Sequence, residues 1–175
     1  TVGKFAGMGY CMKSGIGSCA VQIGELQIAA VVAVNALGDI FDWKTGDKIA
    51  GLLAEDGRSF RDTSELMCAD TRAVDNKFTG NTTIGVVITN AVFDKTRLCK
   101  IAGMAHDGYA RSIRPVHTSA DGDSIYAVSV GNVSADMDLT GMMTAEVMSE
   151  AIIRAVKSAK SAYGFPAAED LKKQV

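Results

Sequence analysis

A threonine directly ahead of an apolar segment is the first candidate for chemistry in this chain. Gly80-Asn81-Thr82-Thr83 precedes the run Ile84–Ala91 (IGVVITNA), which is typical of a buried strand. A threonine hydroxyl can attack the carbonyl of the preceding residue when that peptide is strained, and hydrolysis of the resulting ester leaves a new N-terminal threonine. Its α-amine, with a pKa of about 8, can then act as general base for the hydroxyl. An ordinary polar turn before a strand is the other interpretation.

Four polar residues elsewhere could support such a nucleophile. Asp121 and Asp123 are separated by one glycine and could orient an ammonium group and tune proton transfer. Asn35 ends the apolar run Leu26–Ala36, and its amide could donate to an oxyanion. Lys4, in the glycine-rich opening, could supply positive charge and lower the pKa of a nearby amine. Each also has an ordinary structural interpretation, as a solvated turn, a strand-end cap or a solvated lysine.

Other chemistries fit the sequence less well. His106 and His117 are interpreted as structural, because no nucleophile elbow of the G-x-S-x-G type is present. A metal site is not expected, since the cysteines form no CxxC pair and have no histidine at ligand spacing. We therefore expect no cofactor, and four buried thiols in a reducing cytoplasm: Cys11, Cys19, Cys68 and Cys99.

Composition narrows the class of protein. The chain has 175 residues, with 18 Lys and Arg against 20 Asp and Glu. This length fits one domain, and the balanced charge argues against a nucleic-acid partner. The longest apolar run, Ile28–Val34, is far shorter than the roughly 20 residues of a membrane span, so no membrane association is expected. No leader opens the chain, which predicts a cytoplasmic location, and it starts at Thr1 rather than methionine.

The apolar pattern predicts strands alternating with helices, and hence an α/β layered domain. The predicted strands are Ser18–Gly24, Leu26–Ala36 (buried on both faces), Asp39–Trp43, Ile84–Ala91 and Ile125–Val130. Two helices are predicted, one capped by Asp94 and running to about Ser112, the other capped by Thr140 and running to about Ala162. Residues 54–79 are polar and mixed, which predicts a long loop.

Several segments together form a distinctive pattern: Asn81–Asn90, Met104–Gly108, Ile113–Thr118 and Asp121–Asp123, with Thr1–Lys4 and Lys13–Ser18 upstream. In these segments the chain resembles the P1 peptidase family (peptidase family S58). That family includes the L-aminopeptidase/D-esterase DmpA, β-peptidyl aminopeptidases and nylon-oligomer hydrolases. The resemblance implies a precursor that cuts itself before a serine or threonine. It also implies a four-layer αββα sandwich of the DmpA and ornithine acetyltransferase type, with chemistry like that of N-terminal-nucleophile hydrolases.

The resemblance also implies roles for single residues. Thr82 would be the nucleophile and Asn81–Thr82 the scissile bond. Asn35 would match the oxyanion-side asparagine and Lys4 the lysine near the nucleophile. The acidic pair Asp121 and Asp123 would match the nylon-hydrolase branch.

Family members are longer than this chain, so the resemblance implies the C-terminal half of a family fold. Residues 1–81 would end the α-subunit and residues 82–175 would form the β-subunit. The N-terminal half of the precursor would complete the substrate pocket, and the protein would be a homo-oligomer acting on a small peptide or amide. Two alternatives stay open, an acyltransferase of the ornithine acetyltransferase type and a non-catalytic relative.

Overall fold

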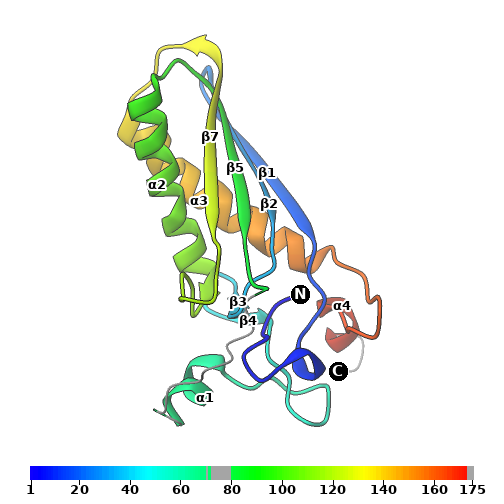
Figure 1. The fold of residues 1–175 in the computed structure, drawn as a ribbon. Coiled ribbons are helices and arrows are strands. Elements are labelled where there is room, and N and C mark those ends of the chain that lie inside the picture. Colours follow the sequence, from blue (N-terminus) through cyan, green and yellow to red (C-terminus); the bar gives the residue numbers. More distant parts are fainter. Residues whose placement is uncertain (70, 72–79, 173–175) are drawn as a thin grey trace.

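A four-stranded sheet with two long helices on one face forms the body of the structure (Figure 1). The computed structural model describes residues 1–69, 71 and 80–172. The strand order is β1-β2-β5-β7, and β7 runs parallel to β5 while the other neighbours are antiparallel. The strands are β1 (Ile16–Ile23), β2 (Leu26–Ala33), β5 (Ile84–Ala91) and β7 (Ser124–Val133). The helices that cover them are α2 (Lys95–Ser112) and α3 (Met137–Lys157).

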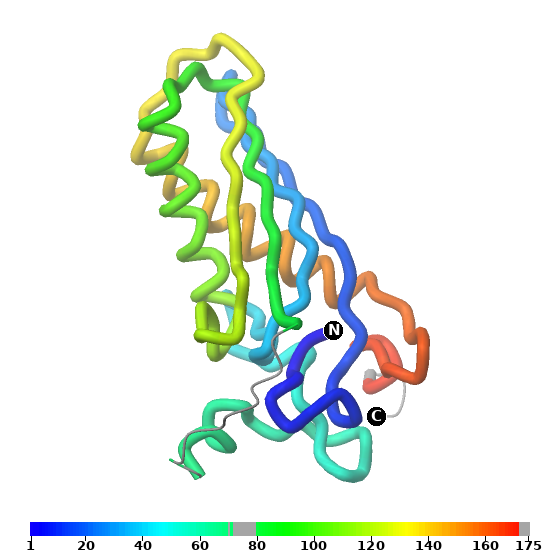
Figure 2. Tube along the Cα trace, viewed as in Figure 1, coloured from blue at the N-terminus to red at the C-terminus, as the bar shows by residue number. Residues whose placement is uncertain are grey.

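A second, smaller sheet lies at one end of the first. Its order is β4-β3-β6. Figure 2 shows the N-terminal segment and the last helix gathered at this same end. The elements of this region are η1 (Met8–Tyr10), β3 (Asp39–Phe41), β4 (Lys48–Ala50), α1 (Thr63–Ala69), β6 (Ile113–Arg114) and α4 (Ala168–Lys172). The predicted α/β class is therefore confirmed, and β5 has the bounds that the sequence predicts.

The large sheet is buried on one face only. Along β2, Ile28, Ala30 and Val32 point into the core while Val31 is 41% exposed. The prediction that this run is buried on both faces is therefore wrong for the described residues. Helices α2 and α3 cover one face, and many exposed side chains of the other face are apolar as well, among them Val31 and Val128. An apolar run consequently alternates in burial although it does not alternate in polarity.

The helix ends follow their capping residues. Asp94 caps α2, as predicted, by accepting a hydrogen bond from the backbone N–H of Arg97. Helix α3 begins earlier than predicted because Asp136, not Thr140, is its N-cap and accepts from the N–H of Leu139. Thr140 lies buried inside the helix, where its hydroxyl donates to the Asp136 carbonyl at 2.7 Å.

Two further predictions need correction. The polar stretch 54–79 is not loop throughout, because it contains α1, whose first turn follows Asp62; positions 70 and 72–79 lie outside the described residues. The side chain of Asp62 accepts from the N–H groups of Ser64 and Glu65, which is a local cap that the lack of apolar periodicity concealed. The cysteines also differ from expectation, since Cys11 and Cys19 are buried but Cys68 and Cys99 are exposed.

Helices α2 and α3 approach closely at a glycine. A Cβ added at Gly108 would lie 2.5 Å from the Ala145 carbonyl oxygen and 2.9 Å from Cβ of Met148. A Cβ at Gly103, in the same helix, would meet no atom within 4 Å. Gly108 therefore sets the spacing of the helix pair, and Gly103 does not.

We expect Gly108→Ala and Gly103→Ala to change stability in opposite directions. Alanine normally favours a helix over glycine by about 1 kcal/mol, and Gly103→Ala should show this gain. Gly108→Ala should lower the free energy of unfolding by about 1–3 kcal/mol, because overpacking outweighs the propensity gain. Urea denaturation of both variants measures the difference, and equal stabilisation would contradict the close packing at Gly108.

Candidate active site

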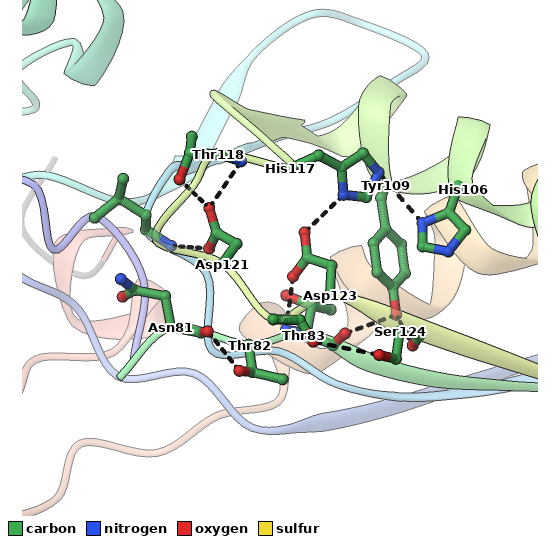
Figure 3. A network of polar contacts seen from close by, with 12 residues as sticks. Asn81, Thr82, Thr83, His106, Tyr109, His117, Thr118, Asp121, Asp123 and Ser124 are labelled. Atoms are coloured by element: carbon green, nitrogen blue, oxygen red, sulfur yellow. Dashed lines mark hydrogen bonds and ion pairs between the residues drawn. The ribbon is translucent and has the colours of Figure 1, made fainter. Parts of the chain in front are cut away.

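The parallel pairing of β5 with β7 brings the threonine and the acidic pair together. Ile84 is paired with Ser124, and the residues before these strands continue side by side through a bridge between Asn81 and Asp121. The Thr82 segment therefore lies next to the Asp-Gly-Asp segment at one end of the sheet (Figure 3). The sequence separates these segments by about 40 residues, and the crossover through α2 closes that distance.

Asn35 approaches the same point from the other neighbouring strand. In the antiparallel pair, Ala33 lies opposite Ile84, so the chain after β2 runs past the residues that precede β5. The N–H of Thr82 donates to the Asn35 carbonyl at 2.9 Å. The Asn35 side-chain amide donates to the Gly80 carbonyl at 2.7 Å. Asn35 thus holds the chain on both sides of Asn81.

Lys4 is buried against Asn35. Its backbone N–H donates to the Leu37 carbonyl at 2.9 Å, and the residue is 1% exposed. The ammonium lies 2.8 Å from Oδ1 and 3.0 Å from the carbonyl oxygen of Asn35, and 3.5 Å from the Gly80 carbonyl oxygen. Burial lowers the pKa of Lys4 from 10.5 to about 8, against the opposing effect of the Asp121 carboxylate. The Lys4 ammonium beside the threonine segment can therefore lose its proton close to neutral pH.

The Asn81–Thr82 peptide is held from several sides. Its carbonyl oxygen accepts a hydrogen bond from the N–H of Gly122 at 3.0 Å. It also contacts the Thr82 hydroxyl, which is the donor of a second, short hydrogen bond. Asn81 is 1% exposed, and its side-chain amide donates to the Ala120 carbonyl at 3.3 Å. The hydroxyl therefore lies next to the carbonyl that it would have to attack.

Asp121 ties three segments of the site together. One carboxylate oxygen accepts from the Leu37 N–H at 3.2 Å. The other accepts from the Thr118 hydroxyl at 2.6 Å and from its N–H at 3.3 Å. The negative charge of Asp121 also raises the pKa of Lys4, against the larger effect of burial. These contacts fix the orientation of Asp121, so that it is more than a solvated turn residue.

Asp123 joins the Thr82 segment to a group of aromatic rings. Its Oδ1 accepts from the Thr83 N–H at 2.8 Å, and its Oδ2 lies 2.9 Å from Nδ1 of His117. Nε2 of His117 lies in turn 3.2 Å from Nδ1 of His106. Because an ionised carboxylate can only accept, Nδ1 of His117 carries the proton of that hydrogen bond. Between the two imidazoles, a hydrogen bond requires a proton on either Nε2 of His117 or Nδ1 of His106. Burial, and then the charge of His117, lower the pKa of His106.

Tyr109 closes this group from inside the core. Its ring stacks on His117 with centroids 5.9 Å apart and meets the edge of His106 at 5.3 Å. Its buried hydroxyl lies 3.3 Å from the carbonyl oxygens of Thr83 and Ser124. Burial raises the pKa of the phenol, which therefore stays protonated and can donate to these carbonyls. Tyr109 consequently links the starts of β5 and β7.

The structure thus brings together all six residues singled out in the sequence: Lys4, Asn35, Asn81, Thr82, Asp121 and Asp123. Sequence reasoning missed His117 and Thr118, which are partners of the acidic pair, and the Gly122 N–H, which donates to the Asn81 carbonyl. The signal was present, since the segment Ile113–Thr118 stood out as a motif without a role. His117 and His106, interpreted as structural, belong to the hydrogen-bond network of Asp123.

Two further features of the described part of the chain bear on other functions. Within residues 1–69, 71 and 80–172, no group of three or more His, Cys, Asp or Glu side chains is placed to hold a metal ion. Among the same residues, none of the helices combines the length and the apolar character that crossing a membrane requires.

The fold is similar to that of a solved aminopeptidase. The structure matches that of the L-aminopeptidase D-Ala-esterase/amidase of Ochrobactrum anthropi, which is described as a new variant among the Ntn hydrolase fold. The TM-score is 0.59 at 17% identity, and the match covers 99% of this chain and 51% of that one. The predicted fold class is thereby confirmed.

The sequence comparisons agree with the fold. The model of Peptidase family S58 matches residues 1–169, and the chain therefore belongs to this family. An uncharacterized aminopeptidase of Mycobacterium leprae is 33% identical over 94% of this chain and 49% of its own length. A 6-aminohexanoate-oligomer endohydrolase of a Kocuria species is 29% identical over 82% of this chain and 44% of its own length. The chain spans about half the length of the curated relatives that it matches.

The environment of Lys4 predicts an unusual titration. In the Thr82→Ala variant, where the hydroxyl cannot react, the Lys4 Cε resonance should titrate with a midpoint of about 8. Asp121→Asn should move this midpoint lower still, because it removes the carboxylate that raises the pKa of Lys4. Carbon-13 NMR of lysine-labelled protein measures both, with Lys4→Arg assigning the signal. A midpoint near 10.5 would contradict the buried position of the ammonium.

Proposed function

We propose that this chain is part of a self-processing amidohydrolase that cuts its own Asn81–Thr82 bond. Thr82 then serves as the N-terminal nucleophile toward an amide substrate. One observation carries the proposal: the Thr82 hydroxyl contacts the Asn81 carbonyl oxygen, while neighbouring segments hold the same peptide group. Membership of Peptidase family S58 and the aminopeptidase and endohydrolase names of the relatives support the hydrolysis of amide bonds.

Self-cleavage proceeds by transfer of the acyl group from nitrogen to oxygen. A bond forms between the Thr82 oxygen and the Asn81 carbonyl carbon, and the hydroxyl proton passes to the Thr82 nitrogen as the C–N bond breaks. Water then hydrolyses the ester, which leaves a carboxylate on Asn81 and a free amine and hydroxyl on Thr82. The Thr82 nitrogen lies 2.9 Å from the Asn35 carbonyl oxygen, which can retain the new amine in place.

After cleavage, the surroundings of Thr82 suit an amine base. The Lys4 ammonium is bound to Asn35, next to the Thr82 nitrogen, and its positive charge lowers the pKa of a neighbouring amine. A larger neutral fraction of that amine can accept the Thr82 hydroxyl proton when the hydroxyl attacks a substrate carbonyl. The Asn35 side-chain amide, once released by Gly80, is the donor available to the substrate oxyanion.

The two aspartates act as positioning groups in this scheme. Asp123 accepts from the Thr83 N–H and thereby fixes the backbone that follows the nucleophile. Asp121 orients the loop at Thr118 and balances the charge of Lys4. Each carboxylate already accepts two or more hydrogen bonds, so its position is set before a substrate binds.

We further propose that the chain is the C-terminal half of its protein and acts on small peptides or amides. The uncovered face of the large sheet carries exposed apolar side chains, which a second sheet would bury: Ile16, Val31, Ile84, Tyr126, Val128 and Val130. The coverage of about half of each relative supports the same division. In this scheme residues 1–81 end one subunit, residues 82–175 form the other, and the other half of the precursor completes the substrate pocket.

Self-cleavage predicts a defined pair of fragments. Intact mass spectrometry of protein expressed from its complete reading frame should find one fragment ending at Asn81 and another beginning at Thr82. Thr82→Ala should abolish this cleavage because it removes the attacking oxygen. Thr96→Ala, which changes an exposed threonine in α2, should cleave as the wild type does. A wild-type protein that keeps a single mass after long incubation would sink the proposal.

The acidic pair should matter more than an ordinary exposed aspartate. Asp121→Asn and Asp123→Asn keep the side-chain shape but remove the charge, and either should reduce amide hydrolysis by about tenfold or more. Asp107→Asn, on the exposed surface of α2, serves as the control and should leave the rate unchanged. Steady-state hydrolysis of an aminoacyl amide measures this difference. Equal effects at all three positions would mean that Asp121 and Asp123 form only a structural turn.

A further inference from the structure

A backbone N–H already points at the carbonyl that self-cleavage would attack. Gly122 N lies 3.0 Å from the Asn81 carbonyl oxygen. We propose that this Gly122 N–H is the oxyanion donor of the self-cleavage step, and that Asn35 donates only to the oxyanion of a substrate, after cleavage is complete. The inference rests on the proposed function, because it names the group that stabilises the first intermediate of that reaction.

The first step needs such a donor. Attack of the Thr82 oxygen converts the Asn81 carbonyl oxygen from a neutral acceptor into an oxyanion, and a hydrogen bond to that oxygen strengthens as the charge develops. The Thr82 hydroxyl also donates to this oxygen before the reaction, but it gives up its proton during attack. The Gly122 N–H keeps its proton throughout, so it is the contact that survives into the intermediate.

The donor is held in place on both sides. The N–H of Asp121 donates to the Thr118 carbonyl at 3.0 Å, and the N–H of Ser124 donates to the Thr83 carbonyl at 3.0 Å. The first bond closes a turn in the loop before β7, and the second joins the start of β7 to the residue before β5, so the peptide plane of Gly122 is fixed between them. A donor fixed before the reaction needs no reorganisation when charge develops, which is what gives such donors their catalytic effect.

Asn35 is engaged elsewhere while the chain is uncut. Its amide nitrogen donates to the Gly80 carbonyl, one residue before the scissile carbonyl, and its Oδ1 accepts from Lys4. In this state Asn35 anchors the segment that must be cut. Departure of the Gly80–Asn81 end removes the acceptor from this amide. The same residue can then donate to a substrate, so the two reactions use different oxyanion donors in succession.

The absence of a side chain at Gly122 is also part of the site. A Cβ there would lie 2.9 Å from the Thr82 hydroxyl oxygen and 3.8 Å from the Asn81 carbonyl oxygen. The former distance is too short for an ordinary contact, so any side chain would displace the hydroxyl from the carbonyl. Glycine at position 122 therefore leaves room for the Thr82 hydroxyl while its N–H donates to the Asn81 carbonyl.

The decisive experiment removes only the N–H. Glycolic acid incorporated in place of Gly122 replaces the N–H by oxygen and keeps the chain shape, in protein expressed from its complete reading frame. The fragment beginning at Thr82 should then appear about a hundredfold more slowly, the usual effect of losing one oxyanion donor. Glycolic acid in place of Gly46, whose N–H donates to Asp42 at 2.7 Å in an exposed turn, is the matched control and should not slow cleavage.

A second pair of variants tests the packing. Gly122→Ala keeps the N–H but displaces the hydroxyl, and should slow cleavage by about a hundredfold, as a misplacement of about 1 Å does. Gly103→Ala, which meets no neighbour, should cleave at the wild-type rate. Thermal unfolding of each variant separates slow cleavage from loss of the fold.

If the Gly122 ester fails to fold, NMR of the uncut Thr82→Ala protein decides. A coupling across the hydrogen bond, from the Gly122 nitrogen to the Asn81 carbonyl carbon, is expected, and its absence would overturn the inference. Wild-type cleavage rates in the folded Gly122 ester would overturn the inference alone. A wild-type protein that never cleaves would overturn the proposed function as well, so the two failures are distinguishable.

Discussion

The parallel pairing of β5 with β7 is the constraint on which the candidate site depends. Parallel strands place the residues before them side by side, and the pairing of Ile84 with Ser124 sets this register. A shift by one residue would exchange the faces of every side chain and separate Thr82 from Gly122. The tyrosine hydroxyl of Tyr109, between the carbonyls of Thr83 and Ser124, reinforces the register from the core. The register is therefore a requirement of the proposed chemistry as well as of the fold.

The second constraint is the burial of charge. An ammonium as inaccessible as that of Lys4 is costly unless it is paired and hydrogen-bonded. Its acceptors come from Asn35 and Gly80, and Asp121 lies close enough to raise its pKa. The acceptors lie on the segments that enclose the Asn81–Thr82 peptide. Lys4 can therefore be accommodated only if those segments are in place, which couples the folding of the N-terminal segment to the geometry of the site.

The sequence predicted those parts of the molecule that depend on local pattern. The bounds of β5 and the Asp94 cap follow from an apolar run and a capping residue. The burial of β2 on two faces could not be judged from the sequence, because its outward residues after Gln27 are as apolar as its inward ones and no covering layer lies within the described residues. The start of α3 was misplaced because Asp136 and Thr140 are both acceptable N-caps, and only the structure distinguishes them.

In the candidate site, too, the sequence indicated what depends on local chemistry and not what depends on the packing of distant segments. Thr82, the aspartates, Asn35 and Lys4 were found because their side-chain chemistry suggested roles or because they matched a family pattern. The Gly122 N–H was not, because every residue except proline carries one and only the strand register singles it out. His117 was set aside for lack of a nucleophile of the serine type. Its partner is Asp123, a contact made by the loop that turns back after β6.

The proposed cleavage also changes the electrostatics of the site. It converts one neutral peptide into a carboxylate on Asn81 and an amine on Thr82, both near the Lys4 ammonium. The new carboxylate is attracted to Lys4, and the Asn81 side chain remains hydrogen-bonded to the Ala120 carbonyl. Both interactions oppose dissociation of the cut end. Departure of the Gly80–Asn81 end would expose Asn35 and leave the Thr82 amine as the neighbour of Lys4. Release of the Gly80–Asn81 end, rather than bond cleavage alone, is then the event that makes the site accessible to a substrate.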